Sequence, residues 1–126
     1  MAKILVVDDS PALLELYEFT LSSEGHKVET AKDGVEGLKK AAEFKPDLIL
    51  LDILMPNKDG FETLEELKKE KETSEIPVLL LTNVDEQSKV EEGLKLGATD
   101  YIVKFQQTPN QVVEEIRQVL QKSGKE

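Results

Sequence analysis

The sequence predicts an α/β fold in which five parallel strands form one sheet with helices on both faces. The main observation is that short apolar, β-branched runs alternate with longer segments whose apolar residues recur at helical spacing. The second is size, because 126 residues with 39% hydrophobic content suit one domain with a substantial core. We therefore expect a single domain over residues 1–126, ordered from about residue 3 to residue 121.

Strands and helices are expected to alternate along the whole chain. The short apolar runs predict strands at Lys3–Val7, Lys27–Thr30, Leu48–Leu51, Val78–Leu81 and Tyr101–Val103. The segments of helical period predict helices at Pro11–Glu24, Val35–Phe44, Phe61–Lys69, Glu86–Leu96 and Pro109–Gln121. Ser10 and Thr108 each place a capping hydroxyl before a proline that suits the first helical position. Gly25 and Gly97 stand where the first and fourth helices are expected to end.

The composition excludes several classes of function. A net charge of −10 with no run rich in lysine or arginine argues against direct binding to nucleic acid or anionic lipid. The absence of cysteine and the single histidine, His26, exclude thiolate and multi-histidine metal sites, so a bound metal would need oxygen ligands. The apolar stretches are too short for a membrane span and no export signal is evident, so we expect a cytoplasmic protein.

Polar residues stand where four of the predicted strands end. Asp8 and Asp9 follow the first strand, Asp52 the third, Thr82 the fourth and Lys104 the fifth. Ligands of open α/β sheets bind beyond the carboxyl ends of the strands, so we expect these side chains to gather at one edge. Each also has a plainer interpretation. The first two could cap a helix, Asp52 could stand in a turn, Thr82 could simply end a strand, and Lys104 could be a solvated surface lysine.

The carboxylates require a positive partner. Ser10-Pro11 already supplies a helix cap, and Asp52 interrupts the most apolar run of the chain, where a carboxylate needs a cation beside it. Three close carboxylates repel one another, so we expect Mg²⁺ among them and Lys104 as a second positive charge. This set suits phosphoryl transfer. Asp52 would be the nucleophile, Lys104 would neutralise one phosphoryl oxygen, and the hydroxyl of Thr82 would donate a hydrogen bond to another.

The chain resembles the receiver domain of two-component response regulators from Lys3 to about Leu120. The matching motifs are Val6-Val7-Asp8-Asp9-Ser10, Ala31-Lys32-Asp33-Gly34, Pro46–Pro56 followed by Asp59-Gly60, Ile76-Pro77-Val78 before Leu81-Thr82, and Gly97-Ala98-Thr99-Asp100-Tyr101 before Lys104. The resemblance is to stand-alone receivers of the chemotaxis type. It implies a flavodoxin-like, doubly wound sheet with strand order 2-1-3-4-5 and five helices.

This resemblance implies a role for each residue of the site. Asp52 is expected to accept the phosphoryl group, while Asp8, Asp9 and the backbone carbonyl of Leu54 are expected to hold Mg²⁺ together with it. The donor would be a phosphohistidine on a sensor histidine kinase or a histidine phosphotransfer protein. The chain would thus be a phosphoacceptor that assists its own phosphorylation and slow dephosphorylation, and not an enzyme that turns over a substrate.

The resemblance also implies a conformational switch. Thr82 would move toward the phosphoryl group, and Tyr101 would turn inward, which repacks the face made by the fourth helix, the fifth strand and the fifth helix. A downstream protein effector would bind this face, and we expect a monomer or a weak homodimer. The alternative for Tyr101 is a static aromatic side chain at the end of an edge strand.

The residue after Lys104 departs from the family pattern. Receivers usually have proline there, commonly after a cis peptide bond, but this chain has Phe105. A cis bond before a non-proline residue costs about 3 kcal/mol, so we expect a trans bond and a rearranged loop over Phe105–Thr108. Lys104 is therefore expected to approach Asp52 along a different path.

Three further residues beside the site bear on its chemistry. Asn83 follows the switch threonine where receivers prefer a small residue, and is expected either to narrow access to the site or to add a hydrogen bond. Leu54 and Val84 are apolar and cannot orient a water molecule, so we predict slow loss of the phosphoryl group.

The predicted first helix has an apolar arc of roughly 220° at 100° per residue, wider than one core-facing stripe. Leu13, Leu16, Tyr17 and Leu21 are expected to face the core. Ala12, Leu14 and Phe19 flank this face and, by the resemblance, would dock the helices of the phosphoryl donor. The alternative is a set of scattered surface hydrophobic residues.

Other functions are compatible with the same architecture. A flavin- or nucleotide-binding protein would need a loop that cradles phosphate after the first strand, where this chain has Asp8-Asp9-Ser10-Pro11. A phosphatase would need a further acid or base near Asp52. The main alternative is a receiver fold that acts as a binding module independently of phosphorylation, against which the joint presence of the five site residues argues.

Overall fold

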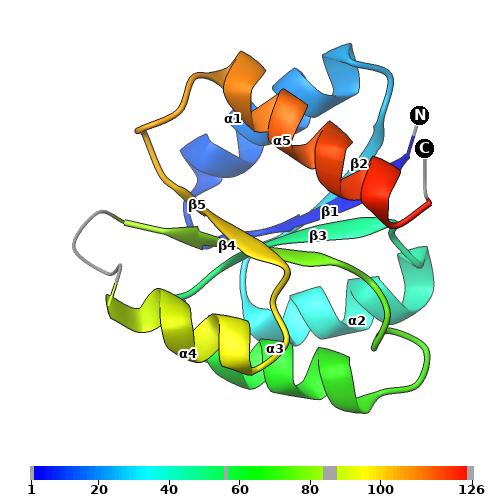
Figure 1. Ribbon diagram of the computed structural model, residues 1–126, viewed down its shortest axis with the longest axis vertical. Helices are drawn as coiled ribbons and strands as arrows, with labels where there is room; N and C mark the ends of the chain where they lie inside the picture. Colours follow the sequence, from blue (N-terminus) through cyan, green and yellow to red (C-terminus); the bar gives the residue numbers. More distant parts are fainter. Residues whose placement is uncertain (1, 56, 84–87, 125–126) are drawn as a thin grey trace.

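The five predicted strands form a single parallel sheet in the computed structural model of the chain, which describes residues 2–55, 57–83 and 88–124. The strands are β1 (Lys3–Val7), β2 (Lys27–Ala31), β3 (Leu48–Asp52), β4 (Val78–Thr82) and β5 (Asp100–Val103). Their order across the sheet is β2-β1-β3-β4-β5 (Figure 1). This arrangement confirms the predicted fold class and strand order.

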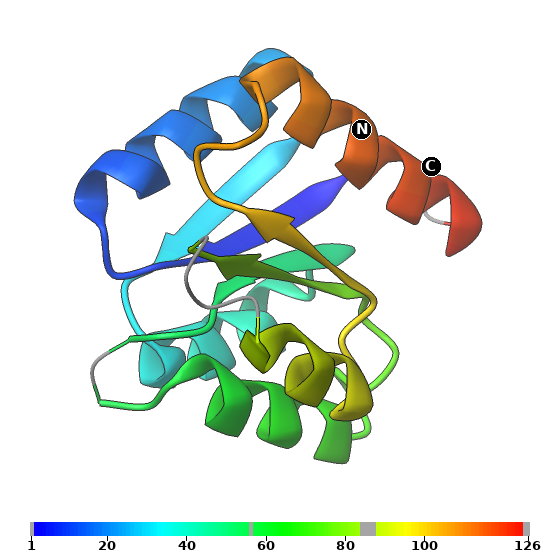
Figure 2. The same ribbon diagram turned by 60° about the vertical axis from the view of Figure 1, so that its left-hand side comes forward.

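Helices cover both faces of the sheet. They are α1 (Pro11–Ser23), α2 (Gly34–Phe44), α3 (Gly60–Lys69), α4 (Val90–Lys95) and α5 (Pro109–Lys122). The first and last lie on one face, and the other three lie on the opposite face, as two views show (Figures 1 and 2). The capping hydroxyls predicted at both ends of the chain are confirmed, because Ser10 Oγ accepts from Leu13 N and Thr108 Oγ1 accepts from Gln111 N.

Two apolar layers separate the sheet from its helices, and side chains of each strand alternate between them. On β3, Leu48 and Leu50 point to the layer shared with α1 and α5. Ile49 and Leu51 point to the layer shared with α2 and α3. All four are fully buried. The sheet is thus a rigid platform whose carboxyl edge is free to present polar side chains.

The buried face of α1 differs in part from the prediction. Leu13, Tyr17 and Leu21 are buried as expected, but Leu16 is 44% exposed and Leu14 packs partly against the core. The reason is helical phase, because the three buried residues advance by about 40° at each step of four residues. Leu14 then lies about 60° from the centre of the buried face and Leu16 about 100° from it. Ala12 is exposed, as predicted for a flanking position.

The fourth helix is shorter in the described chain than its sequence predicts. Its predicted first residue, Glu86, lies outside the described residues. The described helix begins at Val90, after a tighter turn at residues 88 and 89, and ends at Lys95. No side chain caps its start in this part of the chain, since Lys89 holds the N-cap position without a side-chain hydrogen bond. None of the described helices has the length and apolar character that a bilayer span requires.

Candidate functional site

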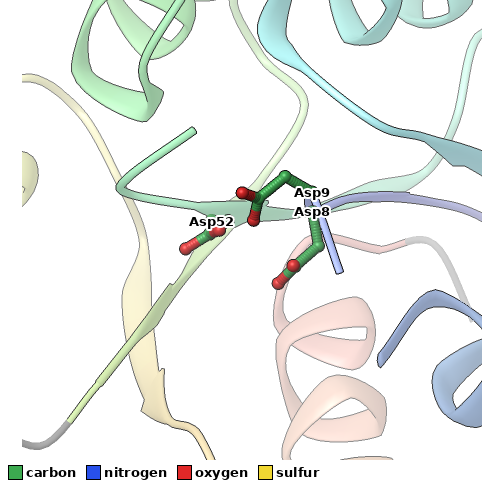
Figure 3. Close-up of side chains that lie close together, drawn as sticks. All are labelled: Asp8, Asp9 and Asp52. Carbon is green, nitrogen blue, oxygen red and sulfur yellow. The ribbon is translucent and has the colours of Figure 1, made fainter. Parts of the chain in front are cut away.

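Three aspartates meet at the carboxyl edge of the sheet. β1 and β3 are neighbours, with Val7 paired to Leu51, so Asp8 and Asp52 leave the sheet side by side. Asp8, Asp9 and Asp52 each offer a carboxylate oxygen, and these oxygens all lie within 4.8 Å of one another. Figure 3 shows the three side chains close together at the ends of the two strands. The predicted acidic cluster is therefore present.

Asp8 is the most enclosed member of this cluster. It is fully buried, and its Oδ1 accepts a hydrogen bond from the N–H of Ser10 at 2.8 Å. Its Oδ2 lies 3.0 Å from Nζ of Lys104, and no group in the described ranges donates a well-oriented hydrogen bond to it. Asp52 is buried as well, whereas Asp9 is exposed. The inner side of the cluster, formed by Asp8 and Asp52, is therefore buried, and its outer side at Asp9 is open to solvent.

Lys104 forms ion pairs with two of the aspartates. Its Nζ lies 3.0 Å from Oδ2 of Asp8 and 3.0 Å from Oδ1 of Asp52. The N–H of Lys104 donates to the carbonyl oxygen of Thr82 at 2.7 Å, which fixes the start of its side chain beside β4. The lysine thus reaches the site from the end of β5, as predicted.

The loop after Lys104 differs from the family pattern in backbone conformation. The described residues contain no cis peptide bond, which confirms the predicted trans bond between Lys104 and Phe105. Phe105 has a φ of 66° and is 79% exposed. The left-handed conformation lets the chain turn toward α5 without proline, and it points a large apolar side chain at solvent.

The charges of the cluster influence one another. Burial raises the pKa of Asp52 to about 7, repulsion from Asp8 acts in the same direction, and attraction to Lys104 opposes both. Burial lowers the pKa of Lys104, but the Asp8 and Asp52 carboxylates outweigh that effect and raise it overall. The two pKa values rise for different reasons, because burial has the largest effect on Asp52 whereas the two carboxylates are what raise the pKa of Lys104.

The two residues predicted to form a switch lie at different heights in the sheet, since Thr82 ends β4 and Tyr101 is the second residue of β5. Asp52 pairs in register with Leu81, so Thr82 comes one residue further along the neighbouring strand. Thr82 is buried, and its hydroxyl donates to the carbonyl oxygen of Asn83 at 3.0 Å. Tyr101 is half-buried and packs against the apolar layer on the α2 and α3 side. Asn83 is exposed.

Of the two apolar residues predicted to flank the site, the structure describes one. Leu54 follows Asp52 by two residues and is 46% exposed, so an apolar side chain does lie at this edge. Val84 lies outside the described residues.

The residues of the cluster fit a divalent cation. Asp8, Asp9 and Asp52 supply only oxygen donors, and Lys104 offsets one of their three negative charges when all are ionised. The buried Oδ2 of Asp8 lacks a well-oriented hydrogen bond within the described chain. Hard oxygen ligands with excess negative charge are what Mg²⁺ prefers.

Tyr17 was predicted to face the core, but neither its place beside the cluster nor the hydrogen bond of Asn57 was predicted from the sequence. Tyr17 is buried beneath the cluster; burial raises its pKa, the charge of Asp8 adds to this effect, and the charge of Lys104 opposes it. The side chain of Asn57, in the segment after β3, donates to Asp33 at the start of α2. The signal for Tyr17 was a polar atom on an apolar helix face; that for Asn57 was an asparagine in a tight connection, where left-handed backbone is common.

The parallel sheet and its acidic edge define a protein of the receiver class. The chain belongs to the response regulator receiver domain family, whose model matches residues 4–120. Membership implies phosphorylation-dependent signalling. The family typically binds Mg²⁺ at an acidic pocket.

Individual relatives agree with this placement. Protein PilH of Pseudomonas aeruginosa is 43% identical over 106 residues, which cover 82% of this chain and 86% of that protein. The alkaline phosphatase synthesis transcriptional regulatory protein PhoP of Bacillus subtilis is 43% identical over 122 residues, or 96% of this chain. This chain spans about half, 49%, of the length of PhoP. The chemotaxis protein CheY4 of Vibrio cholerae has a TM-score of 0.88 at 37% identity, covering 95% of this chain and 99% of that one.

Proposed function

We propose that Asp52 accepts a phosphoryl group from a phosphohistidine on a sensor histidine kinase or a histidine phosphotransfer protein. The observation that carries this proposal is the 3.0 Å contact between Lys104 Nζ and Asp52 Oδ1 beside the acidic pair Asp8 and Asp9. A buried carboxylate held by a lysine can act as a nucleophile toward phosphorus while that lysine stays close enough to meet the incoming oxygens.

In the proposed reaction an oxygen of ionised Asp52 bonds to phosphorus as the phosphorus–nitrogen bond of the donor histidine breaks. The ammonium group of Lys104 then forms an ion pair with a phosphoryl oxygen as well as with Asp52. The hydroxyl of Thr82, which donates to the carbonyl oxygen of Asn83 in this structure, would turn to donate to a second phosphoryl oxygen. The chain is a stoichiometric acceptor in this scheme and not a turnover enzyme.

Asp8, Asp9, Asp52 and the backbone carbonyl of Leu54 would hold Mg²⁺ at this edge. When bound, Mg²⁺ supplies positive charge that keeps the carboxylates ionised and offsets the charge of the phosphoryl oxygens. Burial and Asp8 raise the pKa of Asp52 to about 7, so a cation is needed to favour the nucleophilic form at neutral pH.

The proposed output is a change in the face formed by α4, β5 and α5. An aspartyl phosphate adds nearly two negative charges at the sheet edge, which is enough to bias a two-state element. Thr82 would leave space that Tyr101 fills, and a downstream protein effector would recognise the repacked face. We propose a monomer or weak homodimer that acts in the cytoplasm.

The donor is proposed to dock on α1. Phe19 is 74% exposed on this helix, and Leu16 is exposed as well. Ser10 and the start of α1 lie next to Asp8, so a helix docked along α1 would end near the acidic cluster. The exposed aromatic ring then offers apolar area to the donor helix.

Intact-mass measurement after treatment with acetyl phosphate tests the central claim. Wild-type protein is expected to gain one phosphate when Mg²⁺ is present and far less when EDTA removes it. Asp52→Asn is expected to gain none. An adduct on both proteins, or on neither, would contradict the proposal, and the absence of any adduct would favour a binding module that works without phosphorylation.

A further inference from the structure

A side-chain hydrogen bond attaches the segment between β3 and α3 to the start of α2. Nδ2 of Asn57 donates to Oδ2 of Asp33 at 2.9 Å. Asp33 is the N-cap residue of α2, and its Oδ1 accepts from the N–H of Glu36 at 2.8 Å. The hydrogen bond from Glu36 and then that from Asn57 lower the pKa of Asp33. The carboxylate therefore stays ionised and both of its oxygens are held.

The backbone beside this hydrogen bond is closely packed. A Cβ atom at Gly34 would lie 2.6 Å from the carbonyl oxygen of Lys58 and would overlap Oγ1 of Thr63. That hydroxyl donates to the carbonyl oxygen of Asp59 at 2.8 Å. Only a residue without a side chain fits between α2 and the residues that precede α3. The start of α2 is thus in direct contact with the residue that follows Asn57.

The other end of the segment is packed against the phosphoacceptor strand. The N–H of Gly60 donates to the carbonyl oxygen of Ile53 at 2.7 Å. A Cβ atom at Gly60 would overlap the carbonyl oxygen of Asp52 and lie 2.7 Å from Cα of Ile53. Contacts therefore run without a break from the carboxylate of Asp33, through Asn57 and the start of α3, to the backbone of Asp52.

We infer that the hydrogen bond between Asn57 and Asp33, called here the α2 clamp, positions residues 53–55, which follow Asp52, for Mg²⁺ binding. This inference rests on the proposed function, in which the carbonyl of Leu54 is a metal ligand. The side chain of Leu54 is half exposed, so apolar packing holds this residue only in part. Mg²⁺ demands near-octahedral geometry, and outer contacts that orient its ligands typically change affinity 10- to 100-fold.

Three variants separate this positioning role from general stability. Asn57→Gly removes the donor and adopts the φ of 68° at this position without the strain that alanine would suffer. Asp33→Ser keeps an oxygen that can cap α2 but is too short to reach Asn57. Asn110→Ala removes an exposed asparagine from the first turn of α5, far from the clamp, and serves as the control.

Mg²⁺ affinity is measured by calorimetry without any phosphoryl donor, and amide hydrogen exchange of residues 53–55 is measured on metal-free protein. Both clamp variants are expected to bind Mg²⁺ about tenfold more weakly and to exchange faster, with a melting temperature close to that of the wild type. The double variant should lose no more than either single variant, because both remove the same contact. Phosphorylation by acetyl phosphate should recover in the clamp variants at saturating Mg²⁺.

An unchanged Mg²⁺ affinity in either clamp variant, additive losses in the double variant, or an equal loss in Asn110→Ala would overturn the inference. The proposed function fails by a different result, namely a wild type that gains no phosphate or an Asp52→Asn variant that does. The calorimetric titration involves no phosphorylation, so the two failures are distinguishable.

Discussion

Nζ of Lys104 lies 3.0 Å from Oδ1 of Asp52, and the two side chains are 7% and 3% exposed. The same ammonium group lies 3.0 Å from Oδ2 of Asp8, so one cation is shared by two buried carboxylates. A shared cation cannot fully compensate both, which is why burial and repulsion still raise the pKa of Asp52. The described site therefore has an electrostatic imbalance that a bound divalent cation would relieve.

Lys104→Met is expected to destabilise metal-free protein by about 3 kcal/mol, because it leaves the buried carboxylates without a cation. Urea unfolding at pH 7.5 in EDTA measures this loss, and added Mg²⁺ should restore part of it. Lys58→Met is the matched control, since it breaks the more exposed ion pair between Lys58 and Glu66 and should cost under about 1 kcal/mol. Equal losses in the two variants would contradict the prediction.

The stability of metal-free protein is expected to fall as pH rises through 7. The pKa of Asp52 is raised from 3.8 to about 7, so between these values the folded state keeps a proton that the unfolded state has lost. This contribution is complete below pH 3.8 and is lost as pH rises through 7. Asp52→Asn should therefore melt above the wild type at pH 8 in EDTA, with a smaller difference at pH 5. A difference that does not change with pH would refute this.

Phe105→Asn is expected to stabilise the protein by about 0.5–1 kcal/mol. Phe105 has a φ of 66°, which a bulky side chain adopts at a cost of about 1 kcal/mol and which asparagine tolerates. The ring is mostly exposed, so little buried apolar area is lost. Thermal melts measure the gain, and Phe19→Asn, the same exchange at an exposed position in regular helix, should show no such gain because the two residues have similar helix propensity. A lower melting temperature for Phe105→Asn would mean that the ring contributes more packing than its exposure indicates.

The sheet and the residues at its carboxyl edge could be predicted from the sequence. Strand positions follow from uninterrupted apolar runs. Because a parallel sheet brings the ends of those runs together, Asp8, Asp52 and Lys104 could be assigned to one edge before the structure was known. The phase of α1 could not be fixed this way. Its apolar arc is too wide to select one face, and the choice between Leu14 and Leu16 depends on how the helix sits on the sheet.

Polar contacts within the loops could not be predicted from the sequence either. The α2 clamp joins Asn57 to Asp33, which stand 24 residues apart and carry no pattern that pairs them. The hydrogen bond from Thr82 to the carbonyl of Asn83 depends on a side-chain rotation that strand periodicity does not encode. Periodicity predicts elements and edges, whereas specific polar contacts between loops depend on the packed structure.

Phe19→Ser is expected to slow phosphoryl transfer from the cognate donor protein without changing phosphorylation by acetyl phosphate. The exposed ring lies on α1, away from the reacting carboxylate, so a small donor does not need it. Transfer rates from both donors measure the split. Glu18→Ser, on the neighbouring exposed position, is the control. Unchanged transfer from the protein donor would rule out docking through this residue.

Leu54 gives a prediction about the lifetime of the signal. Its side chain is 46% exposed two residues after Asp52, and an apolar group there cannot orient a water molecule toward the phosphoryl group. We expect slow loss of phosphate from the wild type. Leu54→Gln should speed this loss by a factor on the order of 10, because the amide can hydrogen-bond a water while the backbone carbonyl remains in place.

Intact mass followed over time, after acetyl phosphate is removed from purified phosphorylated protein, measures this lifetime. Leu94→Gln introduces the same amide at an exposed position on α4 and should leave the rate unchanged. Fast loss from the wild type would show that another group orients the water. Equal rates for the wild type and Leu54→Gln would show that the position of Leu54 does not control hydrolysis, and the slow decay would then need a cause elsewhere in the site.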